Sequence, residues 1–225
     1  MSKHGMTKAD ELFYGSAINS GAYKTYERPG VPITPMYRAL LGAPVAADPD
    51  GYATAQAVTA AGDLTLDGVL AGGVADVARG VTIKSTAAGD SAQTATIYGT
   101  DIHGNPVVEV LTFNGSSAVN GKKAFKTVSR IAISAALTGN ASAGTTDVLG
   151  LPVAIDAKSR VIDVFFNDAK DASVTIVVAD STDPATGTTG DVYGTVDPNA
   201  ACNGSDVVAL LVPDPGSYGV VQFMG

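Results

Sequence analysis

The sequence has few of the residues from which catalytic, metal and disulfide sites are built. Its 225 residues include one cysteine, two histidines and no tryptophan. The single cysteine, Cys202, excludes an intramolecular disulfide and is typical of folding in a reducing cytosol. The histidines, His4 and His103, stand alone, without the paired ligands or the Cys/His cluster that zinc requires. We therefore expect no cofactor and no metal site.

Charge is also scarce and unbalanced. Charged residues make up 16% of the chain, against about 25% in an average globular protein, and the formal net charge is −8. This acidic balance would repel a phosphate backbone, so we expect no nucleic acid as a partner. No apolar stretch follows Lys3 and Lys8 as it would in a signal peptide, and the longest apolar runs, such as Val207–Val212, are too short to span a membrane. The sequence predicts a soluble protein with no membrane partner.

Two stretches come close to catalytic or nucleotide-binding motifs and fail on spacing or context. Asn140–Gly144 has asparagine where a serine-hydrolase elbow needs its first glycine, and no histidine lies in the second half of the chain to act as a base. Gly115–Lys122 approaches a phosphate-binding loop, but its spacer is one residue too long and a strand-like segment follows where a helix is needed. We therefore expect a protein that is not an enzyme.

Two short acidic segments place carboxylates close together. Asp48-Pro-Asp50-Gly51 and Asp180-Ser-Thr-Asp183 offer the oxygen ligands that calcium prefers, but neither follows the EF-hand pattern. Aspartate is also a common turn former. We interpret both segments as turns, and His103 as a solvated turn residue.

The first 50 residues differ from the rest of the chain. They contain four of the eight tyrosines and five of the eleven prolines, with equal numbers of basic and acidic residues. The prolines of Arg28–Pro35 forbid a continuous helix and hold the backbone extended. At most, Met36–Leu41 could form a turn or two of helix, ended by Gly42 and Pro44. We predict an extended Pro/Tyr-rich N-terminal arm over residues 1–50.

The aromatic residues of this arm are candidate anchors for a partner. Tyrosine and phenylalanine bury a large area at a low entropic cost, so an extended segment that carries them can dock into grooves of a neighbouring protein. The alternative is that the segment packs on its own domain as an irregular lid. The predicted anchors are Phe13, Tyr14, Tyr23, Tyr26 and Tyr37.

From residue 54 onward, apolar and polar residues alternate, and glycine, asparagine and aspartate interrupt the pattern at short intervals. This pattern is typical of antiparallel sandwiches and barrels. The predicted strands are Thr54–Thr59, Leu64–Leu70, Gly80–Ser85, Ala92–Thr100, Pro106–Phe113, Ala124–Ala136, Thr146–Gly150, Arg160–Asn167, Ser173–Ala179, Asp191–Val196, Asp206–Val212 and Gly219–Phe223. So many short strands indicate two sheets. The fold class is all-β: a two-sheet β-sandwich or jelly-roll-like domain over residues 51–225, with two small β subdomains as the alternative.

Two strand pairings can be predicted from the turns between them. The turn Asp101–Asn105 should join Ala92–Thr100 and Pro106–Phe113 as a hairpin, with Pro106 as the first residue of its strand. A turn at Lys170-Asp171 should pair Arg160–Asn167 with Ser173–Ala179.

Several stretches between residues 97 and 223 form a recognisable set of motifs. Residues 97–131 hold Gly-Thr-Asp, a turn glycine, an apolar strand with Glu109, and then Gly-Lys-Lys-Ala-Phe-Lys. Leu149-Gly-Leu-Pro152 matches as well, and so do Thr189–Gly194 and Asp214–Phe223. These motifs are turns and strand edges, and residues 1–50 are not part of the match. Together they resemble tailed-bacteriophage virion proteins, and the chain looks similar to head decoration, or cement, proteins.

The resemblance implies a function and a place in the cell. Decoration proteins of this kind bind the outer surface of the capsid and stabilise contacts between major capsid subunits. By this likeness the chain would bind the major capsid protein, associate as a homotrimer or homodimer, assemble in the host cytoplasm and end on the outer capsid surface of the virion. The alternatives are another virion part, such as a tail, neck or head-fibre base protein, and a host-surface carbohydrate-binding β module. The absence of tryptophan disfavours the carbohydrate module, because sugar stacking would rest on tyrosine and phenylalanine alone.

Overall fold

The computed structural model of the chain describes residues 37–155, 157–177 and 193–212. The chain divides into two compact units, Met1–Tyr37 and Arg38–Gly225, and the description below concerns the second unit together with Tyr37. The all-β prediction is confirmed. In the described part the one helical element is the 3-10 turn η1 (Lys158–Arg160). The described residues contain no helix long and apolar enough to cross a membrane.

Fourteen strands make up the described chain. They are β1 (Tyr37–Gly42), β2 (Ala53–Ala57), β3 (Gly62–Asp63), β4 (Val74–Ser85), β5 (Thr94–Thr100), β6 (Pro106–Thr112), β7 (Val119–Asn120), β8 (Phe125–Ile133), β9 (Asn140–Gly150), β10 (Val161–Phe166), β11 (Ala169–Lys170), β12 (Thr175–Val177), β13 (Thr195–Asp197) and β14 (Val207–Leu211). They form two sheets, as the sequence predicts.

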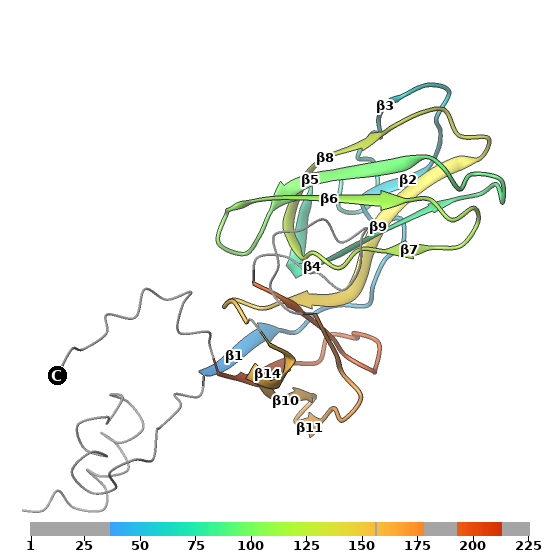
Figure 1. Ribbon diagram of the computed structural model, residues 1–225. Helices are drawn as coiled ribbons and strands as arrows, with labels where there is room; N and C mark the ends of the chain where they lie inside the picture. The colour runs from blue at the N-terminus through green and yellow to red at the C-terminus, as the bar shows by residue number, and fades with distance from the viewer. Residues whose placement is uncertain (1–36, 156, 178–192, 213–225) are drawn as a thin grey trace, which may run out of the picture. The chain divides into compact units, whose positions relative to one another are not determined.

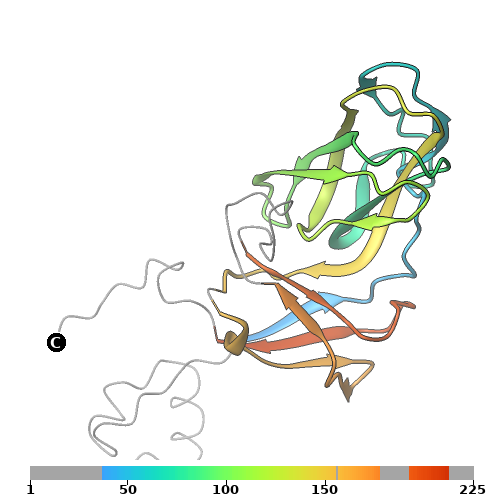
Figure 2. The same cartoon turned by 45° about the vertical axis from the view of Figure 1, so that its right-hand side comes forward.

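The larger sheet has ten strands and curls over its own core (Figures 1 and 2). Its main path runs β12-β13-β9-β4-β8-β5-β6, while β2 pairs with β9, β3 with β8 and β7 with β4. The predicted hairpin of β5 and β6 is confirmed, with pairs from Thr94↔Thr112 to Thr100↔Pro106. Pro106 opens its strand, where the missing N–H removes the least from the ladder.

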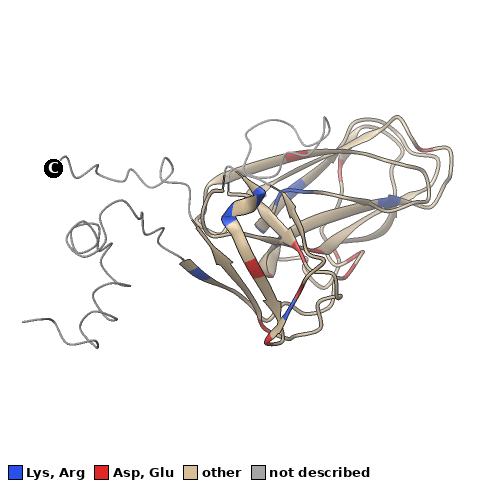
Figure 3. Cartoon of the chain, turned by 60° about the horizontal axis from the view of Figure 1, so that its bottom comes forward, with Lys and Arg blue, Asp and Glu red and all other residues tan. Residues whose placement is uncertain are grey.

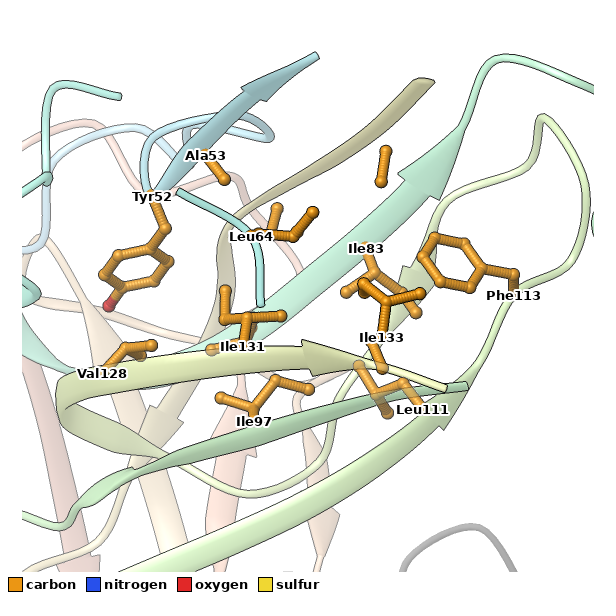
Figure 4. Close-up of a cluster of buried hydrophobic side chains, with 14 of the residues drawn as sticks. Tyr52, Ala53, Leu64, Ile83, Ile97, Leu111, Phe113, Val128, Ile131 and Ile133 are labelled. Atoms are coloured by element: carbon orange, nitrogen blue, oxygen red, sulfur yellow. The ribbon is translucent and has the colours of Figure 1, made fainter. Parts of the chain in front are cut away.

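The core of the larger sheet is a cluster of branched aliphatic and aromatic side chains. Ile97 of β5, Ile83 of β4 and Ile131 of β8 are completely buried, and Figure 4 shows them together with Phe113 and Leu111. In β5 the alternation is regular, because Ala95 and Ile97 are buried while their neighbours are only partly covered. Each large side chain buried in this way contributes about 1.5–3 kcal/mol of transfer free energy.

The smaller sheet has the strand order β1-β14-β10-β11 and a second core cluster. In this cluster Leu41, Val164 and Ala209 from the smaller sheet pack with Leu149 of β9 and Val196 of β13 from the larger one. The two sheets therefore share this core.

The predicted pairing of Arg160–Asn167 with Ser173–Ala179 is wrong. Strand β10 pairs with β14 and with the short β11, whereas β12 pairs with β13. The chain turns at Asn167 and Asp168, whose φ angles are 51° and 61°, and not at Lys170-Asp171. Asparagine and aspartate tolerate this left-handed conformation better than other residues with a side chain, so the tight turn forms there.

The predicted helical turn over Met36–Leu41 is also wrong, because Tyr37–Gly42 forms strand β1. Ala39 and Leu41 are buried in the second core while Arg38 and Leu40 are exposed, which is the period of a strand. Pairing with β14, more than 160 residues away in the sequence, outweighs the weak local preference for helix.

The predicted strand Leu64–Leu70 is a loop, and the strand in this region is the two-residue β3. The Asp67 carboxylate accepts hydrogen bonds from the N–H and hydroxyl of Thr54, at 2.8 and 2.9 Å, so this segment binds β2 through a side chain. Strands β4 and β9 are longer than predicted. The predicted strand Gly219–Phe223 lies outside the described residues.

Candidate functional site

Of the five predicted anchor residues, the structure describes one, Tyr37. Tyr37 is the first residue of β1 and its side chain is 43% exposed. Phe13, Tyr14, Tyr23 and Tyr26 lie outside the described residues. The surface beside β1 is therefore the part of the predicted binding region whose geometry can be described.

A groove with a volume of about 130 Å³ lies along β1. Its lining is mainly apolar: Leu40, Leu41, Val77, Ala78, Ile102 and Pro152. Leu40 is 69% exposed and Ile102 is 47% exposed, so two of the most exposed large apolar side chains of the described chain stand at this groove. Asp76 and Lys126 supply its charged lining.

The wall of the groove formed by Ile102 is held rigidly by the turn of the β5–β6 hairpin. The buried Asp101 carboxylate accepts hydrogen bonds from the backbone N–H groups of His103 and Asn105, at 2.8 and 2.9 Å. The His103 ring then donates from Nε2 to the carbonyl of Pro152 at 2.9 Å. His103 is an exposed turn residue, as interpreted, and its ring in addition ties the hairpin to Pro152 in the lining of the groove.

Strand β1 differs from β6 and β10 in how its outer side is covered. The edge strand β6 begins with proline, and the ammonium of Lys123 donates to the carbonyl of Val108 in this strand at 2.9 Å. On the outer side of β10, β11 pairs with it and the N–H of Asp171 donates to the carbonyl of Val164. Such devices keep other chains from adding to a sheet edge. Strand β1 contains no proline or lysine and has the exposed Arg38 as its one charged residue, and no described strand pairs on its outer side.

The buried charged side chains serve the fold. The Arg79 side chain is 1% exposed; its Nε donates to the carbonyl of Thr146 at 2.7 Å and its Nη1 to the carbonyl of Val45 at 3.1 Å. The same guanidinium lies 3.2 Å from Asp76 and 3.3 Å from Asp147. It thereby joins β4 and β9 to the segment that leaves β1.

Two buried carboxylates also serve the fold, because they accept hydrogen bonds from backbone N–H groups. Asp90 accepts hydrogen bonds from the hydroxyl of Ser85 and from the N–H groups of Thr138 and Gly139, and these bonds lower the pKa of Asp90 below its ordinary value. Glu109 is 1% exposed and accepts the N–H of Lys122 at 2.7 Å. In the stretch that approaches a phosphate-binding loop, the N–H of Lys122 thus donates to the protein's own carboxylate, and the N–H groups of Gly115 and Gly121 donate to backbone carbonyls.

The acidic segment at Asp48 is a turn, as interpreted. The N–H of Asp50 donates to the Asp48 carboxylate, and this hydrogen-bonded carboxylate raises the pKa of Asp50. The N–H of Gly51 donates to the carbonyl of Asp48. In the described ranges no three His, Cys, Asp or Glu side chains are grouped closely enough to hold a metal ion. The segment Asp180–Asp183 lies outside the described residues.

Two further titratable groups lie near the Arg79 cluster. Burial, together with a hydrogen bond to Asp147, raises the pKa of the Cys202 thiol to about 12. Burial also raises the pKa of Asp197 in β13, and the negative charges of Asp147 and Asp171 add to this shift. The thiol is therefore protonated at neutral pH, and Asp197 carries its charge at a cost in free energy.

Several of the described residues that carry the likeness to virion proteins are structural in this fold. A Cβ on Gly99 would lie 1.9 Å from the carbonyl oxygen of Thr127, Phe125 is completely buried, and Asp101 and Glu109 are bound as described above. Comparison with protein-family models, with curated proteins and with solved structures found no match to this chain. The described residues form an all-β body with an apolar groove along β1, on whose outer side no described strand pairs.

Proposed function

We propose that the chain is a bacteriophage head decoration protein, which binds the outer surface of the capsid and stabilises contacts between major capsid subunits. The observation that carries the proposal is the use of the buried polar side chains in residues 97–131. Asp101 and Glu109, the conspicuous acids of the segment that resembles virion proteins, bind the chain's own backbone N–H groups. Side chains used in this way stabilise the fold, and a protein whose buried polar groups serve the fold can act by binding a partner with its surface.

The capsid contact in this proposal comes from the aromatic residues of the N-terminal segment. Phe13, Tyr14, Tyr23 and Tyr26 precede the body in the sequence, and the half-exposed Tyr37 begins its first strand. Aromatic side chains dominate the free energy of many interfaces, because they bury a large area with few rotatable bonds. Several such anchors on one segment can contact two capsid subunits at once, which adds avidity without new contacts on the body.

Charge supports an outer location on the head. The net charge of −8 disfavours contact with packaged DNA. Figure 3 shows acidic and basic positions interspersed on the described strands and loops. A protein that binds only the assembled shell stabilises it by about 2.7 kcal/mol per site at a concentration 100 times its Kd. Summed over the many equivalent sites of a shell, this free energy is large.

The test is co-sedimentation with expanded, mature heads of the phage that encodes the chain, stripped of their own decoration protein. Full-length protein should bind at a regular stoichiometry and raise the melting temperature of the shell. A full-length variant with Phe13, Tyr14, Tyr23 and Tyr26 changed to serine should bind at least tenfold more weakly, which corresponds to about 1.4 kcal/mol. The matched control is Val69→Ser, which removes an apolar side chain that is 82% exposed on the body.

Each outcome has a clear consequence. Regular binding that depends on the four aromatic residues supports the proposal and the role of the anchors. Binding that survives their replacement keeps the decoration function and moves the contact to the body. Absence of binding to heads overturns the proposal, and binding to purified tails in the same assay would identify a tail component instead.

A further inference from the structure

The last strand of the described chain, β14, is already paired on both edges, so a later segment cannot pair with it. Strand β14 ends at Leu211 and lies between β1 and β10 in its sheet, so both of its edges are paired. The remaining segment, residues 213–225, begins with the turn-forming sequence Pro213–Gly216 and contains Gly219–Phe223, which the sequence predicts as a strand. A strand formed there cannot pair beside β14.

At one end of the same sheet, no described strand pairs with the outer side of β1, whereas the other end is the two-residue strand β11, which contains Lys170. The chemistry of the edge at β1 fits this segment. Asp214 is the one charged residue in 213–225, so Gly219–Phe223 is uncharged. Val221 and Phe223 would lie on the same face of a strand, since side chains alternate along it. The groove beside β1 has a volume of about 130 Å³. A cavity of about 150 Å³ accepts a benzene ring, so the groove has room for one large apolar side chain such as that of Phe223.

Chain connectivity favours a segment from another molecule. The N–H of Gly204, before β14, donates to the carbonyl of Pro44, after β1, so β14 ends beside the start of β1. To reach the outer edge of β1 in the same molecule, the connection from β14 would have to pass over the chain that enters β1. Connections that cross one another at the same end of a sheet are rare in folded proteins. A segment from a second copy meets no such obstacle.

We propose that residues 219–223 of a second copy of this chain add as a strand to the open edge of β1, with apolar side chains in the groove between Leu40 and Ile102. Addition to a sheet edge is a common mode of recognition: main-chain hydrogen bonds supply affinity, and pockets for alternate side chains supply specificity. A reciprocal exchange of this segment closes a dimer, and exchange around a ring closes a trimer. The interface concerns self-association and does not depend on the identity of the capsid partner.

The first test is chemical cross-linking between two singly substituted full-length proteins. Leu40→Cys and Phe223→Cys are mixed and treated with a short bismaleimide, which joins two thiols. The native Cys202 does not compete, because it is 1% exposed and its thiol pKa is raised to about 12. We expect a covalent heterodimer, formed about tenfold faster than in a mixture of Val69→Cys with Phe223→Cys, since binding raises the local concentration of the reacting pair. Val69 is 82% exposed and lies outside the groove lining, so it reports random collisions.

Three results would overturn the proposal. The first is equal cross-linking of the Leu40→Cys and Val69→Cys mixtures, or none in either. The second is an internal cross-link in a chain that carries both Leu40→Cys and Phe223→Cys, formed at a rate independent of protein concentration and without heterodimer in the mixture, because the segment would then bind its own molecule. The third is a monomeric wild-type protein at high concentration in analytical ultracentrifugation.

A second measurement separates the groove from the fold. Leu40→Asp places a charge at the groove and should shift the assembly to monomer by ultracentrifugation, while Val69→Asp should leave the assembly unchanged. Leu40 is 69% exposed, so circular dichroism should show the same β-sheet signal and melting behaviour for both variants. An unchanged assembly of a folded Leu40→Asp protein would show that the groove is not the interface.

Discussion

Replacement of Arg79 tests the inference that one buried guanidinium joins β4 and β9 to the segment that leaves β1. The side chain is 1% exposed and donates to the carbonyls of Thr146 and Val45, and it lies within 3.3 Å of Asp76 and Asp147. In Arg79→Met the hydrocarbon volume is largely kept, but two carbonyls lose their donor and two partly buried carboxylates lose their counter-charge. Removal of one partner from a buried ion pair costs about 3–5 kcal/mol.

The matched control is the same substitution at an exposed arginine. The Arg130 side chain is 48% exposed, lies 3.7 Å from Asp63 and stacks 4.2 Å above the ring of Tyr98. Exposed ion pairs and cation–π contacts are each worth about 1 kcal/mol or less, so Arg130→Met should have a small effect.

Urea unfolding followed by circular dichroism gives both free energies. Because a change of 1 kcal/mol shifts the melting temperature of a domain of this size by about 2–4 °C, Arg79→Met should melt about 6–20 °C below wild type. Arg79→Lys should fall between the two, since an ammonium keeps the charge but cannot reach all four acceptors. Equal stability of Arg79→Met and Arg130→Met would refute the assignment of Arg79 as the link between β4, β9 and the segment that leaves β1.

Three further substitutions test the packing and the electrostatics of the body. Gly99→Ala should destabilise the protein strongly, since its Cβ would lie 1.9 Å from the carbonyl oxygen of Thr127, whereas Gly62→Ala meets no atom within 4 Å and should be neutral in the same thermal melt. Tyr52→Phe should be neutral or stabilising by about 1 kcal/mol in urea unfolding, because the buried Tyr52 hydroxyl has no hydrogen-bond partner in the described structure. Asp197→Asn should raise the melting temperature at pH 7.

The sign of the Asp197 effect follows from its raised pKa. A carboxyl whose pKa is higher in the folded than in the unfolded state binds protons more tightly when folded, so its contribution to stability falls as the pH rises from the unfolded to the folded pKa. The gain from Asp197→Asn should therefore be full at pH 7 and disappear near pH 3, where the wild-type carboxyl is protonated in both states. An equal gain at both values would show that packing, not charge, is responsible.

A loss of stability in Tyr52→Phe would indicate a hydrogen bond to the hydroxyl, and a stable Gly99→Ala would contradict the close approach of β5 and β8.

The sequence predicts those strands that are bounded by local signals. The hairpin of β5 and β6 has period-two alternation on both sides of Asp101–Asn105, and all of that information lies within 20 residues. The loop at Leu64–Leu70 shows the limit of the method, because its alternation resembles a strand. There the carboxylate of Asp67 binds Thr54 and competes with a regular ladder. Local patterns cannot show which of these two contacts is stronger.

The candidate site was harder to predict than the fold because it depends on which strand edges remain open. Alternation in β1 tells which side chains share a face, but the burial of Ala39 and Leu41 requires β14, and the groove requires Ile102 and Pro152 from elsewhere in the chain. The exposure of Leu40 acquires meaning only when these neighbours are known. A composition-based signal was present, namely an apolar strand without proline or lysine, but it does not identify the other wall.

Because β1 packs through long-range contacts that composition does not reveal, the N-terminal segment should be tested by substitution and not by deletion. Composition sets the arm at residues 1–50, yet deletion of that range removes β1, the buried Leu41 and the turn at Asp48, whose backbone N–H donates to the hydroxyl of Thr145 at 2.9 Å. Loss of Leu41 alone would cost about 2–5 kcal/mol. Such a protein would fail to bind a capsid because its body is damaged, and the failure would be mistaken for the loss of anchors. Replacement of the four aromatic residues before Tyr37 leaves both core clusters intact, so loss of binding in that variant can be assigned to the anchors themselves.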